Sequence, residues 1–341
     1  MNRVLSVLLP SLLLAACGQQ AQVPSAPASE APSAGTIRAQ ATGYWVSGTY
    51  SNAYGARYYR LWVPAGYDGA TARPMMVMLH GCTQDGYDFA AGTRMNTIAD
   101  ARNFLVLYPE QGTAYNGYDC WNWFYDVNQH RGSGEPSLIA GMISWVKSNY
   151  RVDSARVGVA GLSAGAAMAN IMGCTYPDHI RKVAASAGIM YRGATTASGA
   201  TSTQSSGSIY DPNERGTSCS NEMGSARRVI PTLLFHGTSD STVSITNTHQ
   251  TAAQWAQAND LAYDGLDDGD IDNTADATVT GTACRSYTRY DYKNSVTGAT
   301  VLQKYVISGL GHAWSGGSTA GSYSDPCGPD ASTLVANFFG F

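Results

Sequence analysis

The sequence predicts an α/β domain with a mostly parallel central β-sheet and helices on both of its faces. Strand-like segments alternate with helical segments along the chain, which is typical of β-α-β units. Two of these segments, Met75–Leu79 and Thr232–Phe235, are continuous apolar runs, as expected for central strands that are buried on both sides. Because 44% of the residues are hydrophobic, the chain can bury a sizeable core.

The predicted strands follow one another at regular intervals. They are residues 58–63, 75–79, 104–108, 157–160, 182–187, 232–235 and 301–307. Apolar residues at three- and four-residue spacing predict a helix over residues 136–146, with Pro136 near its start. Residues 192–224, rich in Gly, Ser and Thr, and residues 263–282, rich in Asp and Gly, are predicted to be irregular surface excursions.

The N-terminus has the pattern of an export signal. Residues 1–16 combine a charged start with an apolar run too short to span a bilayer, which predicts a signal peptide. The segment Leu14-Ala15-Ala16-Cys17 resembles the lipobox of bacterial lipoproteins, which implies a lipid on Cys17 that tethers the protein to a membrane. An ordinary signal peptide with an incidental cysteine is the alternative. Residues 17–40 are then the lipidated cysteine and a flexible tether, and residues 41–341 are one folded domain.

The charge of the chain argues against nucleic acid as a partner. Charged residues make up 13% of the sequence, the net charge is −4, and basic residues cluster no further than pairs such as Arg227-Arg228. Few charges together with many Gly, Ser, Thr and Tyr residues are typical of a secreted protein. We therefore expect the protein outside the cell or on its surface.

Six cysteines remain once Cys17 is assigned to lipid, and in an exported chain they predict three disulfides. Fifteen connectivities are possible. Proximity along the chain favours the pairs Cys82 with Cys120, Cys174 with Cys219, and Cys284 with Cys327. A metal site is the alternative, but the chain has no Cys-x-x-Cys pair and no histidine at ligand spacing nearby, so we expect no metal.

The segment Gly161-Leu162-Ser163-Ala164-Gly165 matches the Gly-x-Ser-x-Gly pattern of a nucleophile elbow, in which Ser163 is the nucleophile. Side chains at positions 161 and 165 would crowd the neighbouring strand and helix, so both positions require glycine. Chance alone gives roughly 0.4 such matches in a chain this rich in Gly and Ser. The context supports the motif, since an apolar strand precedes it and small helix-forming residues follow it. A Gly-rich turn without chemistry is the alternative.

A serine nucleophile needs a base, and the base needs an acid that fixes its tautomer. In hydrolases with this elbow the order along the chain is Ser, Asp, His. His312 fits the base, because it lies in a Gly-rich loop after the 301–307 strand, and we interpret His236 and His249 as structural. Asp240, in the loop after the 232–235 strand, fits the acid.

The Asp-rich stretch 264–272 follows no strand that ends near the elbow. Like charges at this density usually mark a solvated loop. A calcium site is the alternative, although the full EF-hand spacing is missing.

The negative charge that develops on a substrate oxygen needs two backbone N–H donors. Ala164, the residue after the nucleophile, supplies the first. The loop Leu79-His80-Gly81-Cys82-Thr83-Gln84 occupies the position of the second, and Cys82 is its candidate donor. A disulfide at Cys82 would stiffen the loop; a plain strand-end turn is the alternative.

Six motifs occur together and in this order. They are Leu79-His80-Gly81-Cys82-Thr83-Gln84, Cys120-Trp121-Asn122-Trp123-Phe124, Arg131-Gly132-x-Gly134-Glu135, Gly161-Leu162-Ser163-Ala164-Gly165-Ala166-Ala167-Met168, His236-Gly237-x-x-Asp240-x-x-Val243 and Gly311-His312-x-Trp314-x-Gly316-Gly317. Together they resemble the extracellular polyhydroxybutyrate depolymerase family of esterases, which is related to the feruloyl and acetylxylan esterases of carbohydrate esterase family 1.

The resemblance covers residues 58–341. It implies the α/β-hydrolase fold and serine-esterase chemistry without a metal or cofactor. It also implies Ser163, Asp240 and His312 as the catalytic triad and the N–H groups of Cys82 and Ala164 as the oxyanion hole.

Two departures from the family pattern bear on the substrate. Ser315 stands where many relatives have proline, and the 29 residues after His312 leave no room for a separate polymer-binding domain. We therefore expect soluble esters, including feruloylated or acetylated polysaccharides, as alternatives to polyhydroxybutyrate polyester or its oligomers. Trp121, Trp123 and Trp314 are candidates for an aromatic rim that binds the substrate, and burial in the core is their alternative role.

The sequence therefore predicts a secreted, lipid-anchored serine esterase that works through an acyl-enzyme. A related serine peptidase shares the elbow and the triad order and is one alternative. A non-catalytic binding lipoprotein that keeps the fold is another.

Overall fold

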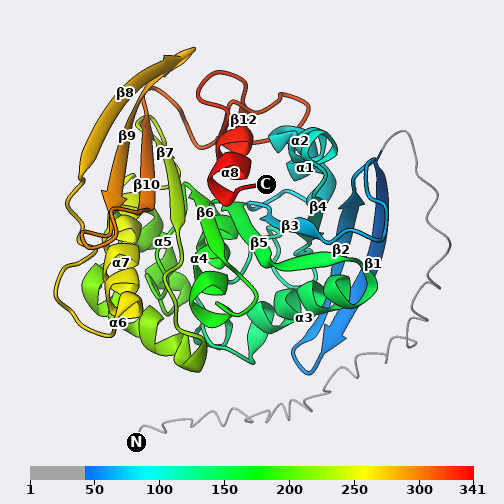
Figure 1. Cartoon of the computed structure of the whole chain (residues 1–341), viewed down its shortest axis with the longest axis horizontal. Coiled ribbons are helices and arrows are strands. Elements are labelled where there is room, and N and C mark those ends of the chain that lie inside the picture. Colours follow the sequence, from blue (N-terminus) through cyan, green and yellow to red (C-terminus); the bar gives the residue numbers. More distant parts are fainter. Residues whose placement is uncertain (1–42) are drawn as a thin grey trace, which may run out of the picture. The chain divides into compact units, whose positions relative to one another are not determined.

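The computed structural model describes residues 43–341, which are built on a ten-stranded β-sheet (Figure 1). Its strands lie in the order β1-β2-β4-β3-β5-β6-β7-β10-β9-β8. Neighbours from β4 to β10 in this order pair in parallel, whereas the strands at both edges pair antiparallel. The strands are β1 (Tyr44–Asn52), β2 (Gly55–Val63), β3 (Arg73–Leu79), β4 (Leu105–Pro109), β5 (Val152–Leu162), β6 (Lys182–Ser186), β7 (Thr232–Gly237), β8 (Ala277–Ala283), β9 (Arg285–Lys293) and β10 (Thr300–Ile307).

Helices cover both faces of this sheet, so the predicted α/β architecture is confirmed (Figure 1). Met75 and Val77 of β3 belong to one core cluster, with residues of α3, α4 and α7, whereas Met76 and Met78 belong to a second cluster, with residues of α1, α2 and α8. A strand that feeds both clusters has no solvent-facing side, which is why its sequence is a continuous apolar run. The helices are α1 (Gly86–Thr93), α2 (Met95–Arg102), α3 (Gly134–Asn149), α4 (Ala164–Thr175), α5 (Ala197–Ser206), α6 (Pro212–Glu222), α7 (Thr246–Tyr263) and α8 (Ala331–Phe339).

All seven predicted strands are present, but the antiparallel edge strands β1, β8 and β9 are additional. Strand β8 is half-exposed or exposed along its whole length, and β9 mixes Arg, Thr and Tyr without a clean alternation. Neither therefore shows the apolar pattern by which a buried strand is predicted. The two short strands β11 (Trp314–Ser315) and β12 (Ser324–Asp325) form a separate parallel pair.

The prediction that residues 192–224 are irregular is wrong, because α5 and α6 lie within them. Each begins at a side-chain cap: Thr196 accepts a hydrogen bond from the amide of Gly199, and Asp211 accepts from the amides at the start of α6. A capping Asp followed by proline is a helix-start signal that the composition of the stretch concealed. The second stretch, 263–282, also ends in regular structure, in β8.

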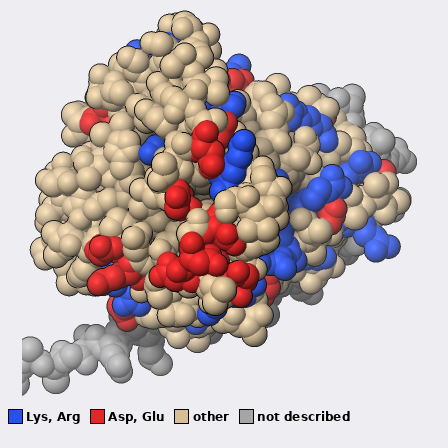
Figure 2. All heavy atoms as spheres, turned by 60° about the vertical axis from the view of Figure 1, so that its left-hand side comes forward, with Lys and Arg blue, Asp and Glu red and all other residues tan. Residues whose placement is uncertain are grey.

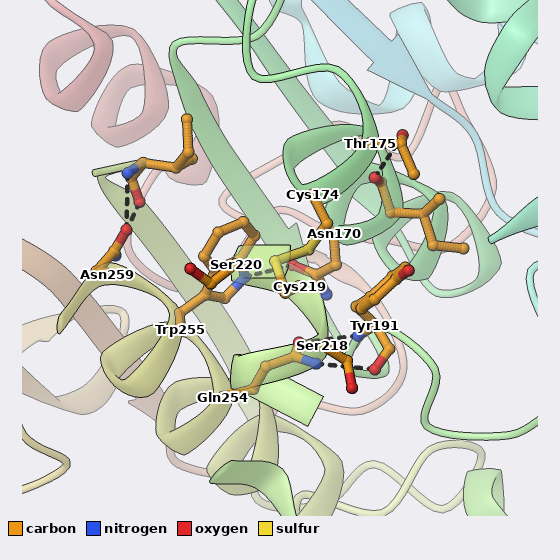
Figure 3. Close-up of a disulfide and its surroundings, with 12 residues drawn as sticks. Asn170, Cys174, Thr175, Tyr191, Ser218, Cys219, Ser220, Gln254, Trp255 and Asn259 are labelled. Carbon is orange, nitrogen blue, oxygen red and sulfur yellow. Dashed lines mark hydrogen bonds between the residues drawn. A yellow bond between two sulfur atoms is a disulfide. The ribbon is translucent and has the colours of Figure 1, made fainter. Parts of the chain in front are cut away.

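Helix α4, which follows the elbow serine, is buried along its entire length. The Cys174–Cys219 disulfide joins it to α6, and the Trp255 indole N–H of α7 donates to Asn170 Oδ1 at 2.9 Å (Figure 3). The Asn170 amide in turn donates to the Ile189 carbonyl at 2.9 Å. Covalent and polar contacts thus fix α4 against its neighbours.

The three disulfides have the predicted pairing, with Cys82 bonded to Cys120, Cys174 to Cys219 and Cys284 to Cys327. Each pair closes a loop of 38 to 45 residues, so partners near in the chain meet in the fold.

The surface carries few charges. Much of the face in Figure 2 is neither acidic nor basic, and many of its Asp and Glu side chains gather in one patch. Within residues 43–341, no helix combines the length and apolar character needed to cross a membrane. The predicted signal peptide, the lipidated Cys17 and the tether lie outside the described residues.

The disulfides allow a matched test of burial. Cys174–Cys219 and Cys284–Cys327 close loops of similar length, 45 and 43 residues, so chain entropy predicts a similar loss of about 4 kcal/mol for either double alanine variant. Because Cys174 and Cys219 are fully buried, their removal also leaves a cavity and should cost more. Urea denaturation of the two variants measures the difference; an equal or smaller loss for the buried pair would contradict this account.

Candidate active site

Ser163 lies between β5 and α4 in a strained backbone conformation, with φ 57° and ψ −121°. Its amide donates to the Ser186 carbonyl of β6 at 2.9 Å. A Cβ on Gly165 would overlap the carbonyl oxygens of Leu79 and His80, and a Cβ on Gly161 would overlap Gly165 itself. The close approach of strand and helix therefore requires both glycines, as predicted, and it holds the serine at the carboxyl edge of the sheet.

His312 and Asp240 come together from two neighbouring loops. His312 Nδ1 lies 2.8 Å from Asp240 Oδ2, and the amides of Thr242 and Val243 each donate to Asp240 Oδ1 at 2.9 Å. Burial acts to raise the pKa of Asp240, but the hydrogen bonds from His312 and the two amides outweigh it and leave the pKa below its ordinary value. Asp240 is thus an ionised acceptor that requires the proton of His312 on Nδ1, which leaves Nε2 as the basic nitrogen.

The loop that carries Cys82 is fixed at the two amides that flank this residue. The Gly81 N–H donates to Gln84 Oε1 at 2.9 Å and the Thr83 N–H to the Tyr118 carbonyl at 2.7 Å. Within the described residues the amides of Cys82 and Ala164 donate no hydrogen bond to the protein. Both residues line the same cavity as Ser163, so two uncommitted donors lie beside the serine.

A buried polar cluster that the sequence did not assign supports this loop. The Glu135 carboxylate accepts from the Asn122 amide at 2.8 Å and from the Gln111 side chain at 2.6 Å, and it pairs with Arg57 Nη2 at 3.2 Å. Gln111 also donates to the Cys120 carbonyl at 3.0 Å. Glu135 therefore anchors the segment that the disulfide joins to Cys82. The sequence shows Glu135 beside the predicted start of a helix, but its burial and its partners, which come from distant segments, are seen only in the structure.

The cavity has a volume of about 370 Å³ and contains both Ser163 and His312. Of the described residues that line it, none is Asp, Glu, Lys or Arg. Apolar contacts dominate the lining, since Trp123, Phe124 and Ile189 contribute to it together with the small residues of α5. An uncharged ligand fits this lining best, because an isolated charge would lose its hydration without gaining a partner.

The aromatic rim predicted from Trp121, Trp123 and Trp314 is not formed. Of these three tryptophans, Trp123 alone lines the cavity. Trp121 and Trp314 are almost completely buried, and the Trp314 indole N–H is satisfied inside the protein by Ser332 Oγ at 3.0 Å. The Trp314 ring is stable in the core because its polar atom finds this partner, whereas the Trp121 ring packs beside His80 with 5.7 Å between centroids and its indole nitrogen has no partner among the described residues.

Tyrosines lie at the mouth of the cavity instead. Tyr118, 73% exposed, and Tyr323, 45% exposed, both line it. Tyr323 also faces the His312 ring edge-on, with 6.2 Å between the ring centroids. Nothing in the local sequence distinguishes these two tyrosines from the others in the chain.

The Asp-rich loop does not take part in this site. Asp264, Asp268 and Asp270 offer carboxylate oxygens within 4.8 Å of one another, but none of the three lines the cavity. The loop is anchored by Asp260 of α7, whose carboxylate accepts from the buried amide of Ile271 at 2.9 Å. The acidic cluster is therefore a separate surface feature.

Known proteins with similar sequences are esterases and depolymerases. Poly(3-hydroxyalkanoate) depolymerase C of Paucimonas lemoignei is 32% identical over 278 residues, which are 78% of this chain and 63% of that protein. Acetylxylan esterase A of Talaromyces purpureogenus is 29% identical over 300 residues, 82% of this chain and 72% of that protein. The chain thus matches less than two thirds of the depolymerase's length.

Among solved structures, the acetyl xylan esterase from Aspergillus awamori matches with a TM-score of 0.65 and 22% identity, over 86% of this chain and 99% of that chain. This likeness shows that the described domain has the α/β-hydrolase fold. The family described as esterase PHB depolymerase matches residues 57–273, which is more than half of the chain. With its fold and sequence in agreement, the chain belongs to the esterase PHB depolymerase family.

Proposed function

We propose that the protein hydrolyses carboxylic esters through a Ser-Asp-His triad. Ser163 Oγ attacks the ester carbonyl while His312 Nε2 takes its proton, and the N–H groups of Cys82 and Ala164 stabilise the oxyanion. His312 then protonates the departing alcohol, which leaves an acyl group on Ser163. Water, activated by His312, hydrolyses that acyl-enzyme and restores the serine.

One observation carries this proposal. One uncharged cavity is lined by the strained Ser163, by His312 and by the two residues whose amides have no partner within residues 43–341. His312 is in turn paired with Asp240 at 2.8 Å. A nucleophile, a base with its acid and a preorganised anion site are the parts that acyl transfer requires. Membership of an esterase family agrees with this chemistry.

The uncharged lining and the exposed tyrosines favour a neutral polymeric or oligomeric ester as the substrate. A polyester of the polyhydroxybutyrate type is our first candidate, since a relative is named poly(3-hydroxyalkanoate) depolymerase C. Acetylated xylan is the second, since another relative is named acetylxylan esterase A, and a feruloylated polysaccharide has the same neutral ester chemistry.

We further propose that the enzyme works outside the cell, held to a membrane by lipid on Cys17. Three disulfides suit an oxidising compartment. The sequence around Cys17 supports the anchor, and mass spectrometry of the mature N-terminus would test it.

Replacing the nucleophile tests the mechanism. Ser163→Ala should lower kcat for p-nitrophenyl acetate about 10⁴- to 10⁶-fold with the fold intact, because only binding and the oxyanion hole remain. The wild-type protein should also react with a fluorophosphonate at Ser163, and the variant should not. Near-normal turnover by Ser163→Ala, with circular dichroism unchanged, would exclude the proposed triad.

Tyrosine variants test the polymeric substrate. Tyr118→Ala and Tyr323→Ala remove aromatic surface at the mouth of the cavity, so they should lower turnover of the polymer about 5-fold or more beyond any loss on p-nitrophenyl acetate. Polyhydroxybutyrate film, acetylated xylan and methyl ferulate are assayed side by side. Tyr54→Ala is the matched control, since Tyr54 is 47% exposed but lies at the β1–β2 turn and does not line the cavity. Equal losses on polymer and small ester would contradict this role.

A further inference from the structure

His236 lies at the end of β7, four residues before Asp240, and its side chain is fully buried. The sequence favours a structural role for it, because His312 fits the catalytic base by its position in the Gly-rich loop. The structure places its imidazole against the triad acid, with Nε2 3.4 Å from Asp240 Oδ2. The Asp240 side chain is fully buried as well.

Two hydrogen bonds determine the tautomer of His236. Its Nε2 lies 2.9 Å from the Val243 carbonyl, which can only accept, so Nε2 carries the proton. Its Nδ1 lies 2.6 Å from Thr248 Oγ1 of α7, so the threonine hydroxyl donates to Nδ1. Burial lowers the pKa of His236, which favours this neutral form.

The Nε2–H of His236 is donated to Val243 and lies beside the carboxylate oxygen that binds the catalytic histidine. Asp240 Oδ2 lies 2.8 Å from His312 Nδ1, which hydrogen-bonds to it, and 3.4 Å from His236 Nε2, whose N–H is donated to the Val243 carbonyl. Val243 is held at both ends, since its amide donates to Asp240 Oδ1 and its carbonyl accepts from His236. The turn that carries the acid is thus closed by the imidazole of the preceding strand.

We propose that His236 is a positioning residue of the triad, which fixes the Asp240 turn and draws part of the Asp240 negative charge away from His312. The inference rests on the proposed function only in calling Asp240 and His312 catalytic. The proposal predicts the direction in which protonation of His312 changes when His236 is replaced. The N–H dipole of His236 beside Oδ2 offsets part of the negative charge of Asp240 and weakens its attraction to protonated His312, so removing that dipole should make His312 take up its proton at higher pH.

The other titratable groups around this pair lie on neighbouring elements. His249 of α7 follows Thr248, and its Nδ1 lies 3.2 Å from Lys304 Nζ of β10. Lys304 in turn faces the rings of Tyr290 and Tyr292 on β9, and burial lowers its pKa to about 8. Burial and then Lys304 lower the pKa of His249. Among the described residues, His236 and His312 are the only cationic or imidazole groups within 4.0 Å of the Asp240 carboxylate.

The test is His236→Leu, which keeps a similar volume and removes the donor. An NMR titration of the His312 ring should show its midpoint raised by about half a pH unit relative to wild type, a readout that does not depend on activity. In p-nitrophenyl acetate assays kcat should fall about 10-fold with KM nearly unchanged, and the acid limb of the kcat/KM profile should move to higher pH by the same amount.

Three further variants separate positioning from packing. His236→Gln keeps an N–H donor near the position of Nε2 and should restore most of the wild-type midpoint. Thr248→Val removes the partner of Nδ1 and should give a smaller shift of the same sign, less than additive with His236→Leu. His249→Gln is the matched control, because this neighbouring imidazole contacts Lys304 and not Asp240, and it should leave the midpoint in place.

An unchanged His312 midpoint in His236→Leu, or a fully additive double variant, would overturn the inference. If His236→Leu does not fold, the His312 midpoint is measured in Thr248→Val instead, and an unchanged midpoint there would overturn the inference. A raised midpoint in a protein whose Ser163→Ala variant keeps full turnover would uphold the contact and reject the proposed triad. The two hypotheses therefore fail in different ways.

Discussion

The backbone of Ser163 is the constraint on which the site depends. A residue with a side chain takes φ 57° and ψ −121° only where its surroundings leave no alternative. Here its amide is bound to the Ser186 carbonyl and its carbonyl accepts from Ala167 at 3.0 Å, while Gly165 is pressed against the end of β3. The contact that strains the serine also brings the β3 loop beside it, so the nucleophile and the Cys82 amide are positioned by one packing arrangement.

Parallel pairing extends this arrangement to the other catalytic groups. Because β3, β5, β7 and β10 run in the same direction, the loops that carry Cys82, Ser163, Asp240 and His312 emerge at one edge of the sheet. The last two loops are also joined directly, since the Ser239 amide donates to the Leu310 carbonyl at 3.0 Å and Gly237 packs against Leu310. Backbone contacts between the two loops therefore fix the spacing of Asp240 and His312, in addition to the contact between their side chains.

Features with a local signal could be predicted from the sequence. The elbow, the apolar central strands and the disulfides fall in this group, since the cysteine pairs are also neighbours along the chain. Features set by distant partners could not. Trp314 is in the core because Ser332 satisfies its indole, and β8 exists because it pairs with β9, although its own residues are largely exposed. The tyrosines at the cavity mouth are likewise defined by where their loops lie.

The two His-Gly pairs share one local sequence pattern but differ in the hydrogen bonds that their histidines make. His80-Gly81 and His236-Gly237 end two buried strands, and both imidazoles are buried and kept neutral by burial. Their tautomers are opposite. The Gln111 amide donates to His80 Nε2 at 3.0 Å, so Nδ1 donates to the Gly81 carbonyl, whereas His236 donates from Nε2 to Val243. His80 ties the end of β3, on the oxyanion side, to the segment that follows β4, and His236 ties the end of β7, on the acid side, to the loop beyond it. A neutral imidazole suits both places, because it donates from one nitrogen and accepts at the other without bringing a charge beside the reacting groups.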